Sequence, residues 1–382
     1  MDEQTTHTGK PHYPVLDGLR GTAALLVVMF HLMESVTADQ SANLLRHGYL
    51  AVDFFFALSG YVMGYAYDER WSRQSVASFF KARLIRLHPV IVVGVVMGAI
   101  SYVVDPFPPL PHTPSLAAAL TALAAGLLLL PSWALPDRGT DYFPYNGVFW
   151  TLFLEYLANV AYAVVLRFVS TRILAMLVAA AAALLVWRAA VYDTLHLGYD
   201  WHTGDMAPVR IAYPFLAGLL LYRIRRAGAS MRLGWAPLSV LLLIAFAIPH
   251  LTDAGGVSWN GLYDAGIVIL LFPAIIAAGA HPVASKVWTS VCEQLGRLSY
   301  PLYGTHYALI YVYADWIKAA SPGRGAIIAV GISTWLVAVL IGWAAAHLWD
   351  EPIRRALRPR KPSMIVGLRP NPDARRAYPP GQ

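Results

Sequence analysis

Residues 16–34 read LDGLRGTAALLVVMFHLME and decide the fold class, because this stretch is apolar along most of its length. About 20 consecutive, mostly apolar residues are enough for a helix to cross the hydrocarbon core of a bilayer. The stretch nevertheless holds Arg20 near its start and His31 eleven residues later. Each such side chain costs on the order of 3 kcal/mol inside a membrane, so each marks a candidate functional site.

The composition of the whole chain supports a membrane protein. Of its 382 residues 57% are hydrophobic and only 13% are charged, about half the charged fraction of a soluble domain, and the mean hydropathy is +0.51. We therefore predict an all-α, multi-pass membrane protein. One integral domain is expected over 1–360, followed by a basic, disordered cytoplasmic tail over 361–382.

The net charge of +7 does not indicate nucleic-acid binding, because the basic residues cluster at the ends of apolar segments. The single cysteine, Cys292, excludes an internal disulfide and a cysteine-based metal site. The first apolar segment lacks a small-residue cleavage site, so we expect it to remain as a span. His196 and His202 match no metal-ligand spacing, and no metal is expected.

Candidate spans are counted by length and apolar character. Eleven segments qualify: 17–36, 48–67, 88–104, 115–133, 147–166, 173–191, 208–223, 235–252, 263–280, 298–316 and 324–348. The basic stretches 70–86, 223–232 and the chain after 353 should all be cytoplasmic. Two cytoplasmic stretches must be joined by an even number of membrane crossings, but five candidate spans lie between the first two stretches. The proline-flanked segment 115–133 is therefore predicted to be re-entrant or peripheral, which leaves about ten spans and both termini cytoplasmic.

This topology predicts the depth of the polar side chains. Arg20 should lie near the cytoplasmic end of the first helix, with His31 about 16 Å further along. Trp150 and Glu155 in WTLFLEY should lie in the outer half, where Glu155 and His31 could meet. His31 is then either a packing histidine or a general base, and Glu155 either the partner of a buried arginine or the group that orients His31.

Three further segments carry candidate side chains. In VDFFFALSGYVMGY, Ser59 and Gly60 permit close approach of another backbone or a narrow ligand, and Asp53 is a lesser candidate. SVASFFKARLIRLHPV resembles a helix on the cytoplasmic surface. Its Arg83 and Arg86 either contact anionic lipid or hold the phosphates of a soluble donor.

The segment LGRLSYPLYGTHYALIY, 295–311, has a polar flank. It places Arg297 at the cytoplasmic edge and His306 roughly mid-membrane, with Tyr300 and Tyr303 between them. Such a flank is typical of a water-accessible cavity or of hydrogen bonding between helices. The loop VYDTLHLGYDWHTGDM, 191–206, should face outside, where it could recognise sugar hydroxyls.

Five motifs, in order along the chain, resemble those of the acyltransferase-3 family of membrane acyltransferases. LDGLRGTAALLVVMFH resembles the family's opening Arg, ten residues and His; FFFALSGYVM resembles Phe-Phe-x-Leu-Ser-Gly-Phe. RLIRLHP resembles Arg-x-x-Arg-x-x-Pro, WTLFLEY resembles Trp-Ser-Leu-x-x-Glu, and LSYPLYGTH resembles Ser-Tyr-x-x-Tyr-x-x-His. The family's known members imply transfer of an acyl group, commonly acetyl, from cytoplasmic acyl-CoA to a hydroxyl of a carbohydrate or glycolipid at the bacterial inner membrane.

The resemblance implies roles for the residues in these motifs. His31 would be the catalytic base and Glu155 its acidic partner, while Arg20, Arg83 and Arg86 would bind the donor. Acyl-CoA would be a co-substrate, with no permanently bound cofactor. The supporting or substrate-binding candidates are Asp53, Ser59, Trp150, Tyr300, Tyr303 and His306.

Departures from the family pattern are few. Thr151 replaces the usual Ser, Tyr61 the usual Phe, and Gly304 the usual Leu, where the smaller side chain could widen the acceptor side. Tyr300 and Ser59 are candidates for stabilising the oxyanion. The chain ends soon after the last predicted span, so we do not expect the extracytoplasmic hydrolase-like domain that some members carry.

Two other classes of protein fit parts of the sequence. A transporter or exporter of a small polar solute also keeps His and Glu inside the membrane, but usually shows an inverted repeat, which we do not find. A sensor or scaffold fits the composition alone. It would tolerate neutralisation of Arg83 and Arg86.

Overall fold

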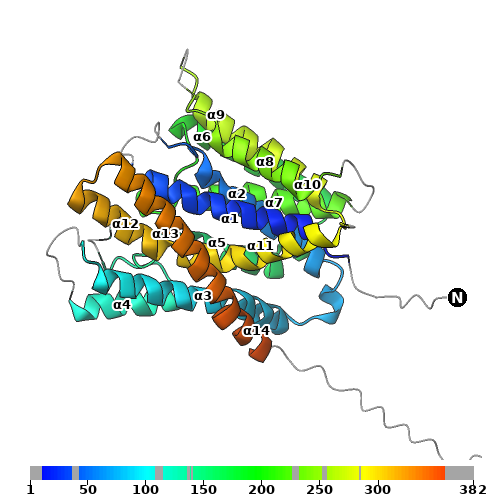
Figure 1. Ribbon diagram of the computed structural model, residues 1–382. Coiled ribbons are helices and arrows are strands. Elements are labelled where there is room, and N and C mark those ends of the chain that lie inside the picture. Colours follow the sequence, from blue (N-terminus) through cyan, green and yellow to red (C-terminus); the bar gives the residue numbers. More distant parts are fainter. Residues whose placement is uncertain are drawn as a thin grey trace, which may run out of the picture.

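The computed structural model describes residues 11–36, 43–107, 115–135, 138, 141–225, 232–251, 256–283 and 285–357. Within these ranges the chain is all-helical, and a single bridge between Asp141 and Asp200 is the only β pairing (Figure 1). The predicted tail over 361–382 lies outside the described residues.

The fourteen α-helices of the described part are α1 (Pro14–Glu34), α2 (Ala51–Tyr67), α3 (Val76–Val104), α4 (Leu116–Leu127), α5 (Phe149–Val164), α6 (Thr171–Tyr192), α7 (Met206–Arg225), α8 (Trp235–Ala247), α9 (Trp259–Gly266), α10 (Phe272–Gly279), α11 (Lys286–Thr305), α12 (Tyr307–Ala320), α13 (Arg324–Ala344) and α14 (Glu351–Leu357). Two π-helical segments, Ile267–Leu271 and Ala345–Asp350, join α9 to α10 and α13 to α14 without a break.

Several helices have the length and surface of membrane spans. In the described part, six are long and apolar enough to cross a bilayer: Pro14–Glu34, Gly48–Tyr67, Val76–Val104, Thr171–Tyr192, Trp259–Gly279 and Arg324–Leu357. Large apolar side chains such as Trp187 on α6 and Leu340 on α13 are exposed, as expected for contact with lipid. The protein is therefore a multi-pass membrane protein.

Helix α4 agrees with the expectation that 115–133 does not span by itself. It has 12 residues, and at 1.5 Å per residue it is about 18 Å long. This is shorter than the roughly 30 Å hydrocarbon core.

One predicted segment boundary was wrong. The surface helix expected over 75–90 and the span expected over 88–104 form one continuous helix, α3, with Pro89 inside it. The span expected over 298–316 includes the end of α11, at Thr305, and the start of α12, at Tyr307. His306 between them has right-handed helical dihedrals, and its amide donates to the carbonyl oxygen of Leu302, so the two helices follow each other directly.

Small residues bring the central helices close together. A Cβ added at Gly60 of α2 would lie 2.0 Å from the carbonyl oxygen of Phe215 on α7, and one at Gly218 would lie 2.0 Å from that of Ala57. The close approach predicted for Gly60 is confirmed. Similarly, Gly21 of α1 faces the backbone of Leu295 on α11.

Helices α1 and α11 run side by side in the same direction (Figure 1). Gly18 of α1 faces Cys292 near the start of α11, and His31 at the far end of α1 stacks on His306. Polar side chains that lie far apart in the sequence therefore meet at two levels of this helix pair. The two levels form the two halves of the candidate site.

Candidate active site

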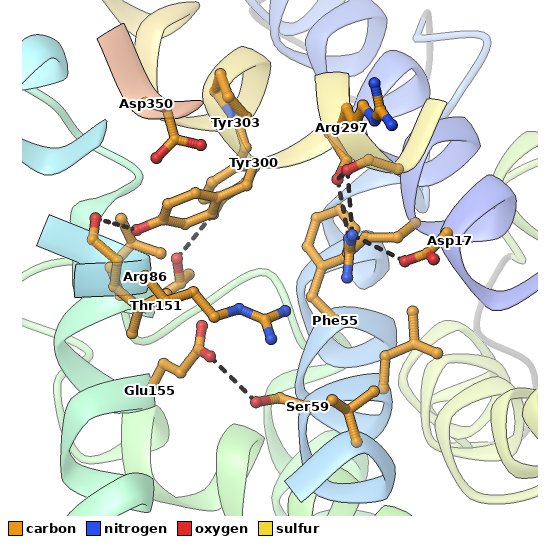
Figure 2. A pocket seen from close by; sticks show the side chains of 18 of the residues that line it. Asp17, Phe55, Ser59, Arg86, Thr151, Glu155, Arg297, Tyr300, Tyr303 and Asp350 are labelled. Atoms are coloured by element: carbon orange, nitrogen blue, oxygen red, sulfur yellow. Dashed lines mark hydrogen bonds and ion pairs between the residues drawn. The ribbon is translucent and has the colours of Figure 1, made fainter. Parts of the chain in front are cut away.

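A cavity of about 430 Å³ lies between α1, α2, α3, α5 and α11 (Figure 2). Its wall is rich in charged side chains. The arginines that line it are Arg20, Arg83, Arg86, Arg297 and Arg354, and the carboxylates are Asp17, Glu155, Glu293 and Asp350. The structure thus brings the three predicted donor-binding arginines into one site.

Arg20 is held by α11 and by its own helix. Its Nε donates to Oγ of Ser299 at 2.9 Å, and its guanidinium also donates to the carbonyl oxygen of Gly296 at 3.1 Å. Asp17, one turn earlier on α1, forms an ion pair with it at 3.0 Å. The polar side chain near the start of the first helix therefore faces protein and cavity.

Glu155 does not meet His31, contrary to the expectation from topology. Its Oε1 accepts a hydrogen bond from Arg83 at 2.6 Å and one from Ser59 at 3.2 Å. The carboxylate therefore belongs to the cavity that holds Arg20. Of the two readings that the sequence left open, the structure supports the partner of a buried arginine.

Two other arginines of the cavity differ in whether they form an ion pair with a carboxylate. Arg354 forms an ion pair with Asp350 at 2.5 Å. Arg86 extends into the cavity from α3 (Figure 2), and among the described residues it has no carboxylate within ion-pair distance. Arg86 can therefore receive an anionic ligand without first breaking a protein contact.

The inner wall of the cavity is formed by tyrosines. Tyr303 bonds the hydroxyl of Thr151 at 2.9 Å, and its ring lies 5.5 Å from that of Phe55 and 5.8 Å from that of His306. Tyr300 donates its hydroxyl proton to the carbonyl oxygen of Leu87 at 2.8 Å.

The two oxyanion candidates are already engaged. The hydroxyl proton of Tyr300 is donated to Leu87, and that of Ser59 to Glu155. Neither residue therefore offers a free donor for an oxyanion in this structure. Their role in stabilising an oxyanion stays a prediction.

Beyond Tyr303, and outside the cavity lining, lies His31. Its Nδ1 is 3.0 Å from Oε2 of Glu34, one turn later on α1. Because an ionised carboxylate only accepts hydrogen bonds, Nδ1 carries the proton and Nε2 bears the lone pair. This is the tautomer that a general base needs, and Glu34 supplies the carboxylate contact that the family resemblance implied for Glu155.

His306 lies against His31, with the two rings stacked 5.6 Å apart between centroids. It is fully buried, and its Nδ1 faces the carbonyl oxygens of Leu302 and Tyr303 at 3.1 and 2.9 Å. Its Nε2 has no hydrogen-bond partner among the described residues. The two histidines therefore present adjacent lone pairs.

Two predicted supporting residues lie away from the cavity. Asp53 is fully buried and forms an ion pair with Arg210 of α7 at 2.6 Å. Trp150 is buried with its ring 5.2 Å from the Arg210 guanidinium. Both therefore stabilise the contact between helices, and neither lines the cavity.

Gly304 serves packing, and the expectation that it widens the acceptor side is wrong. A Cβ at this position would lie 2.3 Å from Cγ1 of Val90 on α3. Its carbonyl oxygen accepts a hydrogen bond from the buried Asn146 at 2.8 Å. A larger residue would force α3 away from α11.

Half-buried polar side chains surround His31 on the side away from the cavity. Tyr307 approaches its ring at 5.1 Å in an edge-on geometry, and Tyr311 lies 4.9 Å from Tyr307. The hydroxyl of Tyr311 donates to Asp141 at 3.3 Å. Burial, together with the nearby charges of Asp200 and Glu34, raises the pKa of the Asp141 carboxyl to about 7, although the hydrogen bond from Tyr311 lowers it.

Sequence reasoning missed Glu34, Arg210, Asp141 and the position of His196. Glu34 follows His31 by three residues, and this spacing on a helix was the available signal. No local pattern could place Asp141 or His196, because both lie in loops that come together only in the fold.

Comparison with known proteins identifies the family of the chain. The family model described as an acyltransferase domain matches residues 13–343. Over 390 residues the chain is 25% identical to acyltransferase MdmB of Streptomyces mycarofaciens, covering 94% of this chain and 95% of that protein. Protein 2 in picA locus of Rhizobium radiobacter is 33% identical over 159 residues, which are 39% of this chain and 80% of that protein.

A third relative is longer than this chain. The peptidoglycan O-acetyltransferase OatA of Listeria monocytogenes is 24% identical over 382 residues, which are 92% of this chain and 57% of the relative. The chain thus spans less than two thirds of that protein. No solved structure matches the chain. Since the family model covers most of its length, the chain belongs to the acyltransferase-3 family of membrane acyltransferases.

Proposed function

We propose that this protein is a membrane O-acyltransferase that moves an acyl group, most simply acetyl, from acyl-CoA to a hydroxyl of a carbohydrate-type acceptor. Family membership supports acyl transfer to oxygen, since relatives are described as O-acetyltransferases. The arginine cavity is the donor site in this proposal. His31 is the general base.

The observation that carries the proposal is the pair of parallel helices that connects both halves of the site. Arg20 of α1 meets Ser299 of α11 in the cavity, and His31 of α1 meets His306 just after α11. At 1.5 Å per residue, Arg20 and His31 lie about 16 Å apart along the helix. An acyl-pantetheine arm that is anchored by its phosphates can extend over such a distance.

The charges in the cavity support an anionic donor. CoA carries phosphates, and the planar guanidinium forms paired hydrogen bonds to phosphate oxygens. Arg86 extends into the cavity without an ion-pair partner in the described part, so binding a phosphate there costs no existing contact. The basic stretches at this end favour a cytoplasmic mouth by the positive-inside rule.

The reaction follows from the tautomer of His31. Nε2 takes the proton of the acceptor hydroxyl while its oxygen forms a bond to the thioester carbonyl carbon. The tetrahedral intermediate then collapses, the carbon–sulfur bond breaks, and the imidazolium returns its proton to the departing CoA thiolate. Ester and CoA thiol are the products, and all atoms balance.

The acceptor approaches from the opposite side in this proposal. Tyr307, Tyr311 and Asp141 surround His31 there, and all three are partly exposed. Hydroxyl-rich ligands are held by such aromatic faces and carboxyl groups. A carbohydrate or glycolipid on the outer side of the bacterial inner membrane fits this arrangement.

The test is turnover of radiolabelled acetyl-CoA by the purified protein in detergent, with and without cell-envelope glycans. We expect CoA release that depends on the glycan, together with label on the glycan. No release with any common acyl-CoA, combined with flux of a polar solute across proteoliposomes, would replace the proposal with the transporter.

A further inference from the structure

Glu34 lies between two histidines at the end of α1. One carboxylate oxygen is 3.0 Å from Nδ1 of His31, and the other is 3.3 Å from Nε2 of His196. His196 comes from the loop between α6 and α7, 162 residues later in the sequence. The carboxylate is therefore held from two directions, which fixes its orientation toward His31.

The backbone on both sides of His196 is anchored by buried charges. The amide of Leu195 donates to the buried Asp264 at 2.9 Å, and the carbonyl of Leu197 accepts from the buried Arg210 at 3.0 Å. Arg210 is in turn paired with Asp53. Two costly buried charges are thus used to fix the loop at the histidine that faces Glu34.

Aromatic rings restrain the same unit. Phe30 contacts His31 at 5.1 Å and His196 at 5.6 Å, edge-on in both cases. Tyr49 stacks on His196 at 4.8 Å with an angle of 12° between the rings. Burial lowers the pKa of His196, and its Nε2 faces Glu34 at 3.3 Å.

Other charged or titratable groups also face this unit. On or beside α12 and in the loops they are His306, Tyr307, Asp141 and Tyr199, while Asp264 of α9 and Arg210 of α7 act on His196. The Glu34 carboxylate lies at hydrogen-bond distance, 3.0 Å, from Nδ1 of His31.

We propose that Glu34 and His196 are positioning residues for His31, with Glu34 fixing its tautomer and charge and His196 fixing Glu34. This inference rests on the function proposed above, because it concerns the general base of that reaction. It explains why a loop histidine and two buried charges converge at the end of α1.

The kinetic test compares Glu34→Gln with Glu34→Asp over about pH 5 to 9. The amide keeps the size of the side chain and removes its charge, so we expect kcat to fall about 10- to 100-fold. The acidic limb of the kcat profile should move down by about one pH unit, with an unchanged KM for acyl-CoA. Glu34→Asp should recover part of kcat. Glu351→Gln, a carboxylate paired with Arg355 on α14, is the matched control.

The role of His196 is tested by removing the ring nitrogen that faces Glu34. His196→Ala should lower kcat about 3- to 10-fold, and His196→Gln, which keeps an N–H, should recover most of it. His347→Ala, at a half-buried histidine on the segment joining α13 to α14, should leave kcat unchanged. Equal kcat values and pH profiles for wild type, Glu34→Gln and His196→Ala would overturn the proposal.

A second readout does not require turnover. Diethyl pyrocarbonate modifies neutral imidazole, and mass spectrometry gives the labelling of His31 at each pH. We expect the labelling curve of His31 to move to lower pH in Glu34→Gln and to stay in place in Glu351→Gln. An unmoved curve would contradict the inference. If wild type transfers no acyl group, the proposed function fails, and this curve still tests the contact between Glu34 and His31.

Discussion

Arg83 and Glu155, 72 residues apart in the sequence, form an ion pair of 2.6 Å in the wall of the donor cavity. Arg83 is almost completely buried, with 5% of its side chain exposed. The Glu155 carboxylate therefore neutralises a guanidinium that α3 carries into the protein. Glu155 is therefore needed to stabilise the wall of the cavity, whether or not it also takes part in the chemistry.

Removing one member of this pair should destabilise the fold. Glu155→Ala leaves the Arg83 charge buried without its partner, which should cost about 3 kcal/mol. Thermal unfolding in detergent measures the loss. The double variant Arg83→Met, Glu155→Leu should recover much of the stability while acyl-CoA binding stays weak. A single variant as stable as wild type would show that water or another group neutralises Arg83.

Arg86 should affect donor binding without affecting folding. It has no ion-pair partner among the described residues, so Arg86→Gln leaves no carboxylate unpaired. We expect the KM for acyl-CoA to rise about tenfold, at an unchanged unfolding temperature. Arg172→Gln, at an exposed arginine near the start of α6, is the control. Equal KM values for Arg86→Gln and wild type would remove Arg86 from the donor site.

Tyr303 separates the cavity from the two stacked histidines. A larger side chain at this position should block the acyl group on its way to His31 while leaving the arginines in place. For Tyr303→Trp we therefore expect normal acyl-CoA binding by calorimetry and loss of transfer. Tyr303→Phe keeps the ring and loses the hydroxyl contacts to Thr151 and to the carbonyl oxygen of Val148, so transfer should fall less than about tenfold. Full transfer by Tyr303→Trp would mean that the acyl group takes another route.

Asp141 should make stability depend on pH. Its pKa is raised to about 7 by burial, well above the usual value near 4. The folded state therefore binds the proton more tightly than the unfolded state, so stability is highest at low pH and falls as pH rises toward 7. The unfolding temperature of wild type should decrease from pH 5 to 8 relative to that of Asp141→Asn. Parallel curves for the two proteins would contradict the shift.

The sequence predicted the fold class and much of the cavity. Long apolar segments predicted helices in a membrane, and Arg20, Arg83, Arg86, Ser59 and Tyr300 do line one cavity. These predictions succeeded because hydrophobic length and the spacing of polar residues on one helix are local properties.

The rest of the site depends on contacts between distant segments. Depth in the membrane suggested that Glu155 and His31 could meet, but depth does not specify which face of α5 points at which helix. The Glu155 side chain points to Arg83, and Glu34 is the carboxylate that lies beside His31. His196 and Asp141 come from loops, which lack the hydrophobic periodicity that predicts the position of a helix.

The measurement that tests the central claim most directly is glycan-dependent release of CoA by wild type and His31→Asn. Asparagine keeps a donor for Glu34 near the position of Nδ1 but has no Nε2 lone pair. We predict that release falls about 100-fold or more while acyl-CoA binding and the unfolding temperature stay unchanged. Undiminished release by His31→Asn would contradict the role of His31 as the general base.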